Sequence, residues 1–281
     1  MKRKSIIVFV TACLDVVLIA LSLSFDFNTQ ACFVTAAHSE NTGYNWYFVP
    51  RSDGLQPRDL PEFSFIKGRD AYWVGDPEEK SIYLTFDAGY ENGYTTKILD
   101  VLKAHHAPAA FFVVGHYIKT APELITRMVN EGHLVCSHSM NHKDMSAIGD
   151  LSAFKADLEQ LENTYKELTG KQMPKFFRPP EGRFSERSLK FAEELGYKTI
   201  FWSFAYKDWY VDAQPSEEEA FKTITTRTHP GAIVLLHATS KTNADVLDRV
   251  ITEWERMGYK LKSLNEFPFE QMKQNPGGSK E

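Results

Sequence analysis

Between residues 81 and 261, short apolar runs typical of buried strands alternate with amphipathic stretches long enough to form helices. The expected strands cover residues 81–86, 109–114, 133–137, 176–177, 198–202, 232–236 and 259–261. Helices are expected at 95–103, from 122 to the glycine at 132, at 152–168, at 185–195, from a capping box at 216, and at 245–257. This order predicts an α/β fold in which about seven parallel strands form an open sheet or a barrel.

The N-terminus has the pattern of an export signal. Three basic residues at 2–4 precede a mostly apolar run from Ile6 to Leu23, and small residues at 34–37 offer a cleavage site. The run is also long enough to suggest an uncleaved membrane anchor, although Asp15 within it favours the cleaved form. We therefore predict an extracytoplasmic protein, in the cell wall or membrane-associated. Any contact with the membrane would be made through residues 1–37, if these are retained.

The rest of the chain divides into three expected parts. Residues 38–78 are rich in proline and have no regular pattern, so they are predicted to be an irregular lead-in to a domain at 79–269, which a polar tail follows at 270–281. The net charge of −5 argues against binding to nucleic acid. Cys136 is the single cysteine after residue 32, so a disulfide scaffold is excluded and a buried structural thiol is expected.

Polar residues follow the expected strands in five clusters. They include Asp87 after the first strand, His138 and His142 after the third, Arg178 in a proline-rich loop after the fourth, Asp208 after the fifth and His237 after the sixth. In a parallel α/β barrel these positions gather on one face, where active sites lie.

The residue types in these clusters suggest particular chemistry. Two histidines four residues apart can bind one metal ion, and an arginine can keep a carboxylate ionised. His237 can donate a proton if Asp208 orients it. Taken singly, each cluster has an ordinary structural interpretation: Asp87 can cap a turn, and Arg178 can form a surface ion pair. It is the five clusters together, all at strand ends, that indicate an active site.

In this order, the motifs Thr-Phe-Asp, His-Ser-x-x-His, Arg-Pro-Pro-x-Gly, Asp-Trp and Leu-Leu-His resemble those of the polysaccharide deacetylase, or NodB-homology, family. The resemblance extends over about residues 79–266. The stretches 85–93, 201–203 and 70–72 resemble one branch, the delta-lactam-biosynthetic de-N-acetylases of spore cortex. The resemblance implies a distorted (β/α) barrel and a hydrolase that cleaves carbohydrate amide bonds.

The resemblance also assigns catalytic roles. Asp87 is expected to be the general base, positioned by Arg178, and His237 the general acid, supported by Asp208. A backbone N–H in the loop around Tyr90 is expected to stabilise the oxyanion.

His138 and His142 are expected to bind a divalent metal ion, zinc or a similar one. The residues predicted to contact substrate are Tyr90, Trp209, Leu235, Pro179 and Arg183.

Two positions depart from the family pattern. The usual third metal ligand is an aspartate directly after the base, where this chain has Ala88, and an Asp-x-x-Asp-Trp motif lacks its first aspartate because Ala205 stands there. A methyl group cannot coordinate a metal ion, so we predict that the ion is held weakly.

The branch resemblance and the export signal predict the substrate. The enzyme is expected to act on peptidoglycan glycan strands, removing acetyl from N-acetylmuramic acid that has lost its stem peptide and so leading to muramic delta-lactam in spore cortex. The pocket must then accept the lactyl carboxylate, for which Arg183 and Lys207 are the candidate cations.

Three alternatives stay open at the level of sequence. They are a deacetylase of N-acetylglucosamine polymers such as chitin or peptidoglycan, a non-catalytic glycan-binding domain, and a glycosidase. A glycosidase usually needs two carboxylates around the scissile bond, and here only Glu181 and Asp208 could join Asp87. Retention of both Asp87 and His237 disfavours a domain that only binds, because binding requires neither a base nor an acid.

Overall fold

The computed structural model describes residues 40–274. The predicted signal or anchor at 1–37 and the last seven residues of the predicted tail lie outside this range. Among the described residues, no helix has both the length and the apolar character that crossing a bilayer requires.

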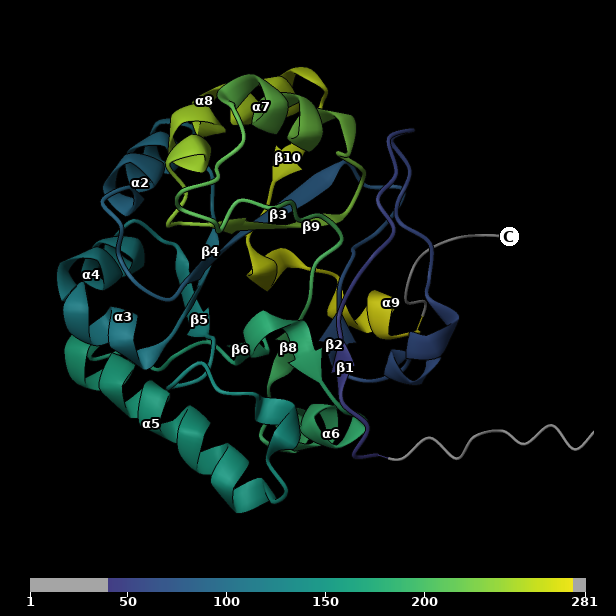
Figure 1. Cartoon of the computed structure of the whole chain (residues 1–281), viewed down its shortest axis with the longest axis vertical. Coiled ribbons are helices and arrows are strands. Elements are labelled where there is room, and N and C mark those ends of the chain that lie inside the picture. The colour runs from purple at the N-terminus through teal and green to yellow at the C-terminus, as the bar shows by residue number, and fades with distance from the viewer. Residues whose placement is uncertain (1–39, 275–281) are drawn as a thin grey trace, which may run out of the picture. The chain divides into compact units, whose positions relative to one another are not determined.

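A curled sheet of parallel strands forms the centre of the fold (Figure 1). Its strands are β2 (Ala71–Tyr72), β3 (Ser81–Ala88), β4 (Ala110–Val113), β5 (Leu134–Ser137), β6 (Phe176–Phe177), β8 (Lys198–Ile200), β9 (Ala232–His237) and β10 (Lys260–Leu261). The order is β10-β3-β4-β5-β6-β8-β2, and β9 pairs with β3. Phe204, which follows β8, bridges in parallel to Val234 of β9 and so joins the two ends of the curl. The predicted distorted (β/α) barrel is confirmed.

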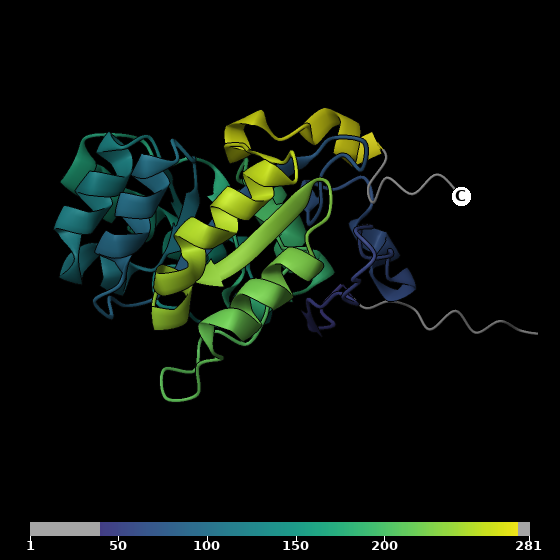
Figure 2. The same cartoon turned by 90° about the horizontal axis from the view of Figure 1, so that it is seen from above.

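Helices cover the outside of the barrel (Figures 1 and 2). They are α2 (Thr95–Ala104), α3 (Gly115–Thr120), α4 (Pro122–Asn130), α5 (Leu151–Thr169), α6 (Glu186–Glu194), α7 (Glu217–Thr226) and α8 (Lys241–Arg256). Three short 3-10 helices lie in the loops between them, η2 (Met145–Ala147), η3 (Pro180–Gly182) and η4 (Leu264–Glu266). The sequence pattern did not predict α3, and it placed the start of α8 at 245; Ser240 in fact caps this helix by accepting a hydrogen bond from the N–H of Asn243.

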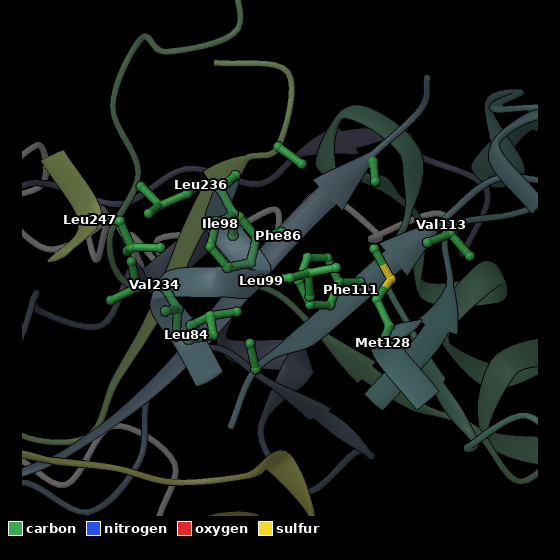
Figure 3. Packing of buried hydrophobic residues seen from close by; sticks show 14 of the residues in the cluster. Leu84, Phe86, Ile98, Leu99, Phe111, Val113, Met128, Val234, Leu236 and Leu247 are labelled. Atoms are coloured by element: carbon green, nitrogen blue, oxygen red, sulfur yellow. The ribbon is translucent and has the colours of Figure 1, made fainter. Parts of the chain in front are cut away.

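The main core lies between the strands and this helical layer. Leu84, Phe86 and Phe111 from the sheet pack with Leu99 of α2 and Leu247 of α8 (Figure 3). Because side chains alternate along a strand, the even-numbered residues of β3 face the helices and the odd-numbered residues face the inside of the barrel. This alternation places the carboxylate at the end of β3 on the inner side.

The lead-in is more ordered than the sequence suggested. Its strand β1 (Tyr44–Asn45) pairs antiparallel with β7 (Arg183–Phe184), a 3-10 helix η1 spans Pro61–Ile66, and β2 joins the main sheet beside β8. The domain boundary predicted at residue 79 therefore assigns β2 to the lead-in, although β2 belongs to the main sheet. The lead-in folds because it buries an aromatic cluster against the barrel; the cluster includes Trp46, Phe63, Trp73, Phe184 and Phe201.

The start of the predicted tail also differs from expectation. Residues 269–274 form a helix, α9 (Phe269–Gln274), and the side chain of Met272 in this helix is buried. Phe269 packs edge-on against Tyr72 of β2, with 4.9 Å between the ring centroids. One turn of apolar contacts is enough to hold this segment against the sheet.

Candidate active site

The carboxyl ends of the strands surround one large cleft that collects most of the predicted site residues. Those lining it are Asp87, Tyr90, His138, His142, Trp209, Leu235 and His237. The side chains of Arg178 and Asp208 are buried behind the lining, with 0% and 1% of their surface exposed. Residues far apart in the sequence thus form a single site, as expected for the strand ends of a barrel.

Asp87 and Arg178 form a buried ion pair beneath the cleft. The Arg178 Nη1–H donates to Asp87 Oδ1 at 2.8 Å, and its Nη2–H donates to Thr85 Oγ1 at 2.9 Å. Two more donors of the guanidinium are also used, because Nε–H donates to the carbonyl of Ile200 at 2.9 Å and Nη2–H to that of Phe201 at 3.3 Å. A guanidinium held at four acceptors fixes the orientation of the carboxylate.

The charges around Asp87 determine its protonation state. Burial alone would raise the pKa of its carboxyl group, but the positive charge of Arg178 and the nearby imidazoles of His138 and His237 outweigh burial, so the pKa lies below its usual range. Asp87 is therefore ionised at neutral pH. Its second oxygen, Oδ2, faces His138 Nε2 at 3.5 Å.

The loop at residues 138–142 is held in a single conformation. The N–H of Met140 donates to Asp157 Oδ1 at 2.7 Å, and the N–H of His142 donates to Ser139 Oγ at 2.9 Å. Ser139 and His142 adopt left-handed backbone angles, with φ of 69° and 55°. Such angles cost about 1–3 kcal/mol for residues other than glycine and are typical of functional sites. A Cβ at Gly115 would lie 2.3 Å from the Met140 sulfur, so only glycine lets α3 approach the loop this closely.

His138 presents an unprotonated nitrogen to the cleft. Its Nδ1–H donates to the carbonyl of Arg178 at 2.8 Å, so the neutral ring keeps a lone pair on Nε2. Burial lowers the pKa of His138 to about 4, which the negative charge of Asp87 only partly offsets, so the ring is neutral at neutral pH. The centroid of the His142 ring lies 5.0 Å away.

These groups fit a weakly held divalent cation. His138 Nε2 and Asp87 Oδ2 are both electron-pair donors, and a cation beside them would relieve their mutual repulsion. The imidazole of His142 supplies a second nitrogen of the type that zinc prefers. Within residues 40–274, however, no three histidine, cysteine, aspartate or glutamate side chains are arranged as a metal site, so His138 and His142 are the residues that would hold an ion here.

His237 and Asp208 form a second polar pair at the end of β9. Asp208 Oδ1 accepts from the Nδ1–H of His237 at 2.7 Å, and Oδ2 accepts from the His237 backbone N–H at 2.8 Å. The side-chain amide of Asn243 also donates to Oδ2 at 2.6 Å, and its carbonyl oxygen accepts from the hydroxyl of Tyr206. Both Nδ1 and the backbone of His237 are thus anchored, and Nε2 is left for the cleft.

Asn243 and Tyr206 were not predicted as site residues from the sequence. Asn243 lies in the first turn of α8, where asparagine is common for structural reasons alone, and Tyr206 lies in an irregular loop. The one available signal was position: α8 directly follows the strand that ends at His237, so its first turn had to lie at the same edge of the sheet.

Most residues predicted to bind substrate lie where expected. Trp209 is 43% exposed and its ring centroid lies 5.7 Å from that of His237, while Leu235 is buried in the floor of the cleft. Tyr90 is 45% exposed in the loop after β3. These three residues bring aromatic and aliphatic surfaces into the cleft.

Two predicted residues lie elsewhere. Pro179 is buried and does not line the cleft; it shapes the loop that carries Arg178. Arg183 also lies outside the lining, and its guanidinium pairs with Glu181 at 3.1 Å and Asp144 at 3.7 Å. Side chains alternate between the two faces of β7, and Phe184 occupies the buried face, so the side chain of Arg183 lies on the exposed face.

Comparison with known proteins agrees with this geometry. Residues 74–200 match the sequence profile described as polysaccharide deacetylase. The peptidoglycan-N-acetylmuramic acid deacetylase PdaA of Bacillus subtilis is 44% identical over 232 residues, which cover 82% of this chain and 88% of PdaA. The chain belongs to the polysaccharide deacetylase family. A structure of PdaA, described as a family 4 carbohydrate esterase, matches with a TM-score of 0.79 and 42% identity over 82% of this chain and 99% of that one.

Two further relatives show how this deacetylase compares with others. An uncharacterised protein of Geobacillus stearothermophilus is 46% identical over 86% of this chain and 91% of its own length. A peptidoglycan-N-acetylglucosamine deacetylase of Bacillus cereus is 32% identical over 69% of this chain and 91% of its own. The protein is accordingly a hydrolase that acts on carbohydrate amide bonds.

The Asp208–His237 pair makes the alkaline limit of this deacetylase's activity testable. Burial lowers the pKa of His237, but the charge of Asp208 and its hydrogen bond, helped by Asp87 and opposed by Arg178, raise it above the usual value. If His237 is the general acid, it must be protonated, so we expect activity below this pKa and its loss above it. In Asp208→Asn the attraction is gone while burial remains, so the alkaline limb of the pH profile of kcat/KM should move to lower pH.

The measurement is the pH dependence of acetate release by both proteins. The melting temperature, followed over the same pH range, separates loss of the acid from unfolding. An unchanged alkaline limb in Asp208→Asn would show that another group supplies the proton.

Ala88 gives a prediction about the metal ion. Its side chain is fully buried in the apolar cluster that contains Val114 and Met140. We expect Ala88→Asp to bind zinc more tightly than the wild type, because it adds a carboxylate beside the two imidazoles. Without metal the variant should be less stable by about 1–3 kcal/mol, since a polar group is buried without a partner.

Competition with a chelator measures the affinity, and urea unfolding of the metal-free proteins measures the stability. Equal zinc affinity in the two proteins would mean that a side chain at position 88 does not reach the ion. Wild-type protein that keeps stoichiometric metal through prolonged chelation would contradict a shell with only two imidazoles.

Proposed function

We propose that this enzyme is an exported de-N-acetylase that removes the acetyl group from N-acetylmuramic acid in peptidoglycan strands that have lost their stem peptides. One observation carries the proposal: the ionised Asp87 and the anchored His237 line one cleft in a chain that is 44% identical to PdaA, a peptidoglycan-N-acetylmuramic acid deacetylase. A base and an acid on either side of a bound acetamide are what amide hydrolysis needs.

The residues of this chain divide the reaction between them. Asp87 accepts a proton from the attacking water, whose oxygen forms a bond to the acetyl carbon. His237 Nε2 donates a proton to the amide nitrogen as the carbon–nitrogen bond breaks, which releases acetate and the free sugar amine. A backbone N–H near Tyr90 stabilises the developing negative charge on oxygen. A divalent cation held by His138 and His142 would polarise the acetyl carbonyl and make water more acidic.

Muramic acid without a peptide carries a free lactyl carboxylate, and the cleft offers a cation for it. The side chain of Lys207 lines the cleft, is exposed, and makes no ion pair within residues 40–274. Of the two cations that the sequence suggested, Arg183 lies outside the cleft lining and is already paired with Glu181 and Asp144. We therefore assign recognition of the lactyl carboxylate to Lys207.

The cellular role follows from the same chemistry. Deacetylation frees an amine within reach of the lactyl carboxylate on the same sugar, and these two groups can close a six-membered lactam only when no peptide occupies the carboxylate. The basic and apolar N-terminus supports a location outside the cytoplasm, at the cell wall or membrane. We propose that the enzyme acts in forming the muramic delta-lactam of spore cortex.

The test compares acetate release from peptide-free glycan strands, from strands that keep their stem peptides, and from chitin oligomers. We expect the fastest release from the peptide-free strands, with mass spectrometry locating the loss of acetyl on muramic acid. Faster release from chitin oligomers would contradict the muramic assignment and leave the deacetylase activity standing.

A Lys207→Met variant sharpens this test. We expect it to slow acetate release from peptide-free glycan by about tenfold, because a charge-assisted contact is lost, while chitin oligomers, which lack the lactyl group, are unaffected. Lys222→Met is the matched control, since Lys222 is also exposed but lies outside the cleft lining. An equal loss on both substrates would show that Lys207 does not recognise the lactyl group.

N-acetylglucosamine polymers are the second candidate substrate. The similarity to the Bacillus cereus peptidoglycan-N-acetylglucosamine deacetylase favours this reading, since the match covers 91% of that protein. Substrate preference in the glycan comparison decides between the two candidates. A domain that only binds glycan would release no acetate from any substrate, with or without added metal.

A further inference from the structure

The lead-in forms part of the wall of the active-site cleft. Trp46, Tyr47, Phe48 and Pro50 line the same cleft as Asp87 and the catalytic histidines, although they precede the residues matched by the family profile, 74–200. Tyr47 is 46% exposed, and Phe48 is partly exposed. Exposed aromatic side chains that line a cleft are a feature of binding sites rather than of folding.

Tyr47 is held in place although its side chain is exposed. Its hydroxyl donates to Glu62, and its ring lies edge-on to that of Phe63, with 5.5 Å between the centroids. Both anchors belong to the lead-in helix η1 and not to the catalytic strand ends. The face of the ring is therefore oriented before any ligand arrives, which reduces the entropy lost on binding.

The backbone beneath Tyr47 is also fixed to the catalytic loop. The N–H of Trp46 donates to the carbonyl of Gly182 at 2.8 Å, and its indole N–H donates to the carbonyl of Trp202 at 2.9 Å. The Trp46 ring stacks on Phe201 with 4.6 Å between centroids. A Cβ on Gly182, whose φ is +67°, would lie 2.8 Å from the Trp202 ring, so glycine is required for this close approach.

We propose that Tyr47 and Phe48 form a subsite for a sugar of the glycan strand next to the one that is deacetylated. The occupant is the glycan strand, because the aromatic wall is continuous with the catalytic cleft and its rings offer flat apolar faces to the C–H faces of a pyranose. The inference rests on the proposed function, and it specifies that the enzyme reads more than one sugar.

The test is the dependence of kinetics on substrate length in Tyr47→Ala. For a peptide-free hexasaccharide we expect KM to rise about three- to tenfold with little change in kcat, because one aromatic contact is lost away from the reacting bond. For the monosaccharide N-acetylmuramic acid, which has no neighbouring sugar to reach the subsite, both constants should match the wild type. Tyr47→Phe keeps the ring and should restore most of the affinity for the hexasaccharide.

Val49→Ala is the matched control, since Val49 is 56% exposed two residues further on but does not line the cleft. An equal rise in KM for both lengths in Tyr47→Ala, or the same rise in Val49→Ala, would overturn the subsite. Should no glycan release acetate, the proposed function fails, and the subsite is then tested separately by tryptophan fluorescence titration of the hexasaccharide. Tighter binding to wild type than to Tyr47→Ala supports the subsite, and equal binding rejects it.

Discussion

Asp87→Asn should reduce acetate release by about two to four orders of magnitude while leaving the protein folded. The amide has nearly the shape of the carboxylate and can still accept a hydrogen bond from Arg178, but it cannot take a proton from water. The rate should fall mainly in kcat, because the group acts on the reacting water and not on the sugar.

Acetate release and thermal unfolding of the same preparation check this prediction. The stability of Asp87→Asn should stay within about 1–3 kcal/mol of the wild type, since it loses the charge of the buried pair but keeps hydrogen-bonding atoms. Near-normal turnover would remove Asp87 from the role of base and would require another carboxylate at the cleft, of which Glu181 is the one in the described lining.

Arg178→Met should destabilise the fold by about 3–5 kcal/mol and also abolish most activity. The methionine fills much of the space but leaves the buried Asp87 charge without its cationic partner, and it removes the contacts of Arg178 with the hydroxyl of Thr85 and the carbonyls of Ile200 and Phe201. Without the guanidinium, burial raises the pKa of Asp87, so less of the base is ionised.

Urea unfolding gives the free energy, and the acidic limb of the activity profile reports the change at Asp87. Arg183→Met is the control, because Arg183 lies only five residues further along, in β7, but makes ion pairs at the surface, where the expected loss is below about 1 kcal/mol. If both variants lost the same stability, the buried pair would contribute no more than an exposed one.

The double substitution of Asp87 and Arg178 separates positioning from chemistry. In an Asp87→Asn background, Arg178→Met no longer leaves a buried carboxylate unpaired, so its cost in stability should shrink. Additive losses would show that Arg178 stabilises the fold through its carbonyl contacts and not through Asp87.

The sequence by itself determined the fold class and the set of candidate catalytic residues. The alternation of apolar runs and amphipathic stretches required a parallel sheet, because such runs bury their apolar faces only between helices. The period of two along residues 81–88 placed Asp87 on the face opposite to that of Leu84 and Phe86, and the spacing of His138 and His142 indicated a pair of ligands. These are local properties, encoded within a few residues of chain.

Only the tertiary structure decided which partners those residues have. Arg178 meets a carboxylate 91 residues away, and Asn243 meets Asp208 35 residues before it, and no local pattern records such distances. The lead-in became part of the cleft because its scattered aromatic residues are buried against the barrel. Arg183 lies outside the cleft lining because Phe184 occupies the buried side of β7. Packing thus gave side chains of the same type different surroundings: Arg178 is buried in an ion pair, whereas Arg183 is paired at the surface. Packing depends on the whole chain at once.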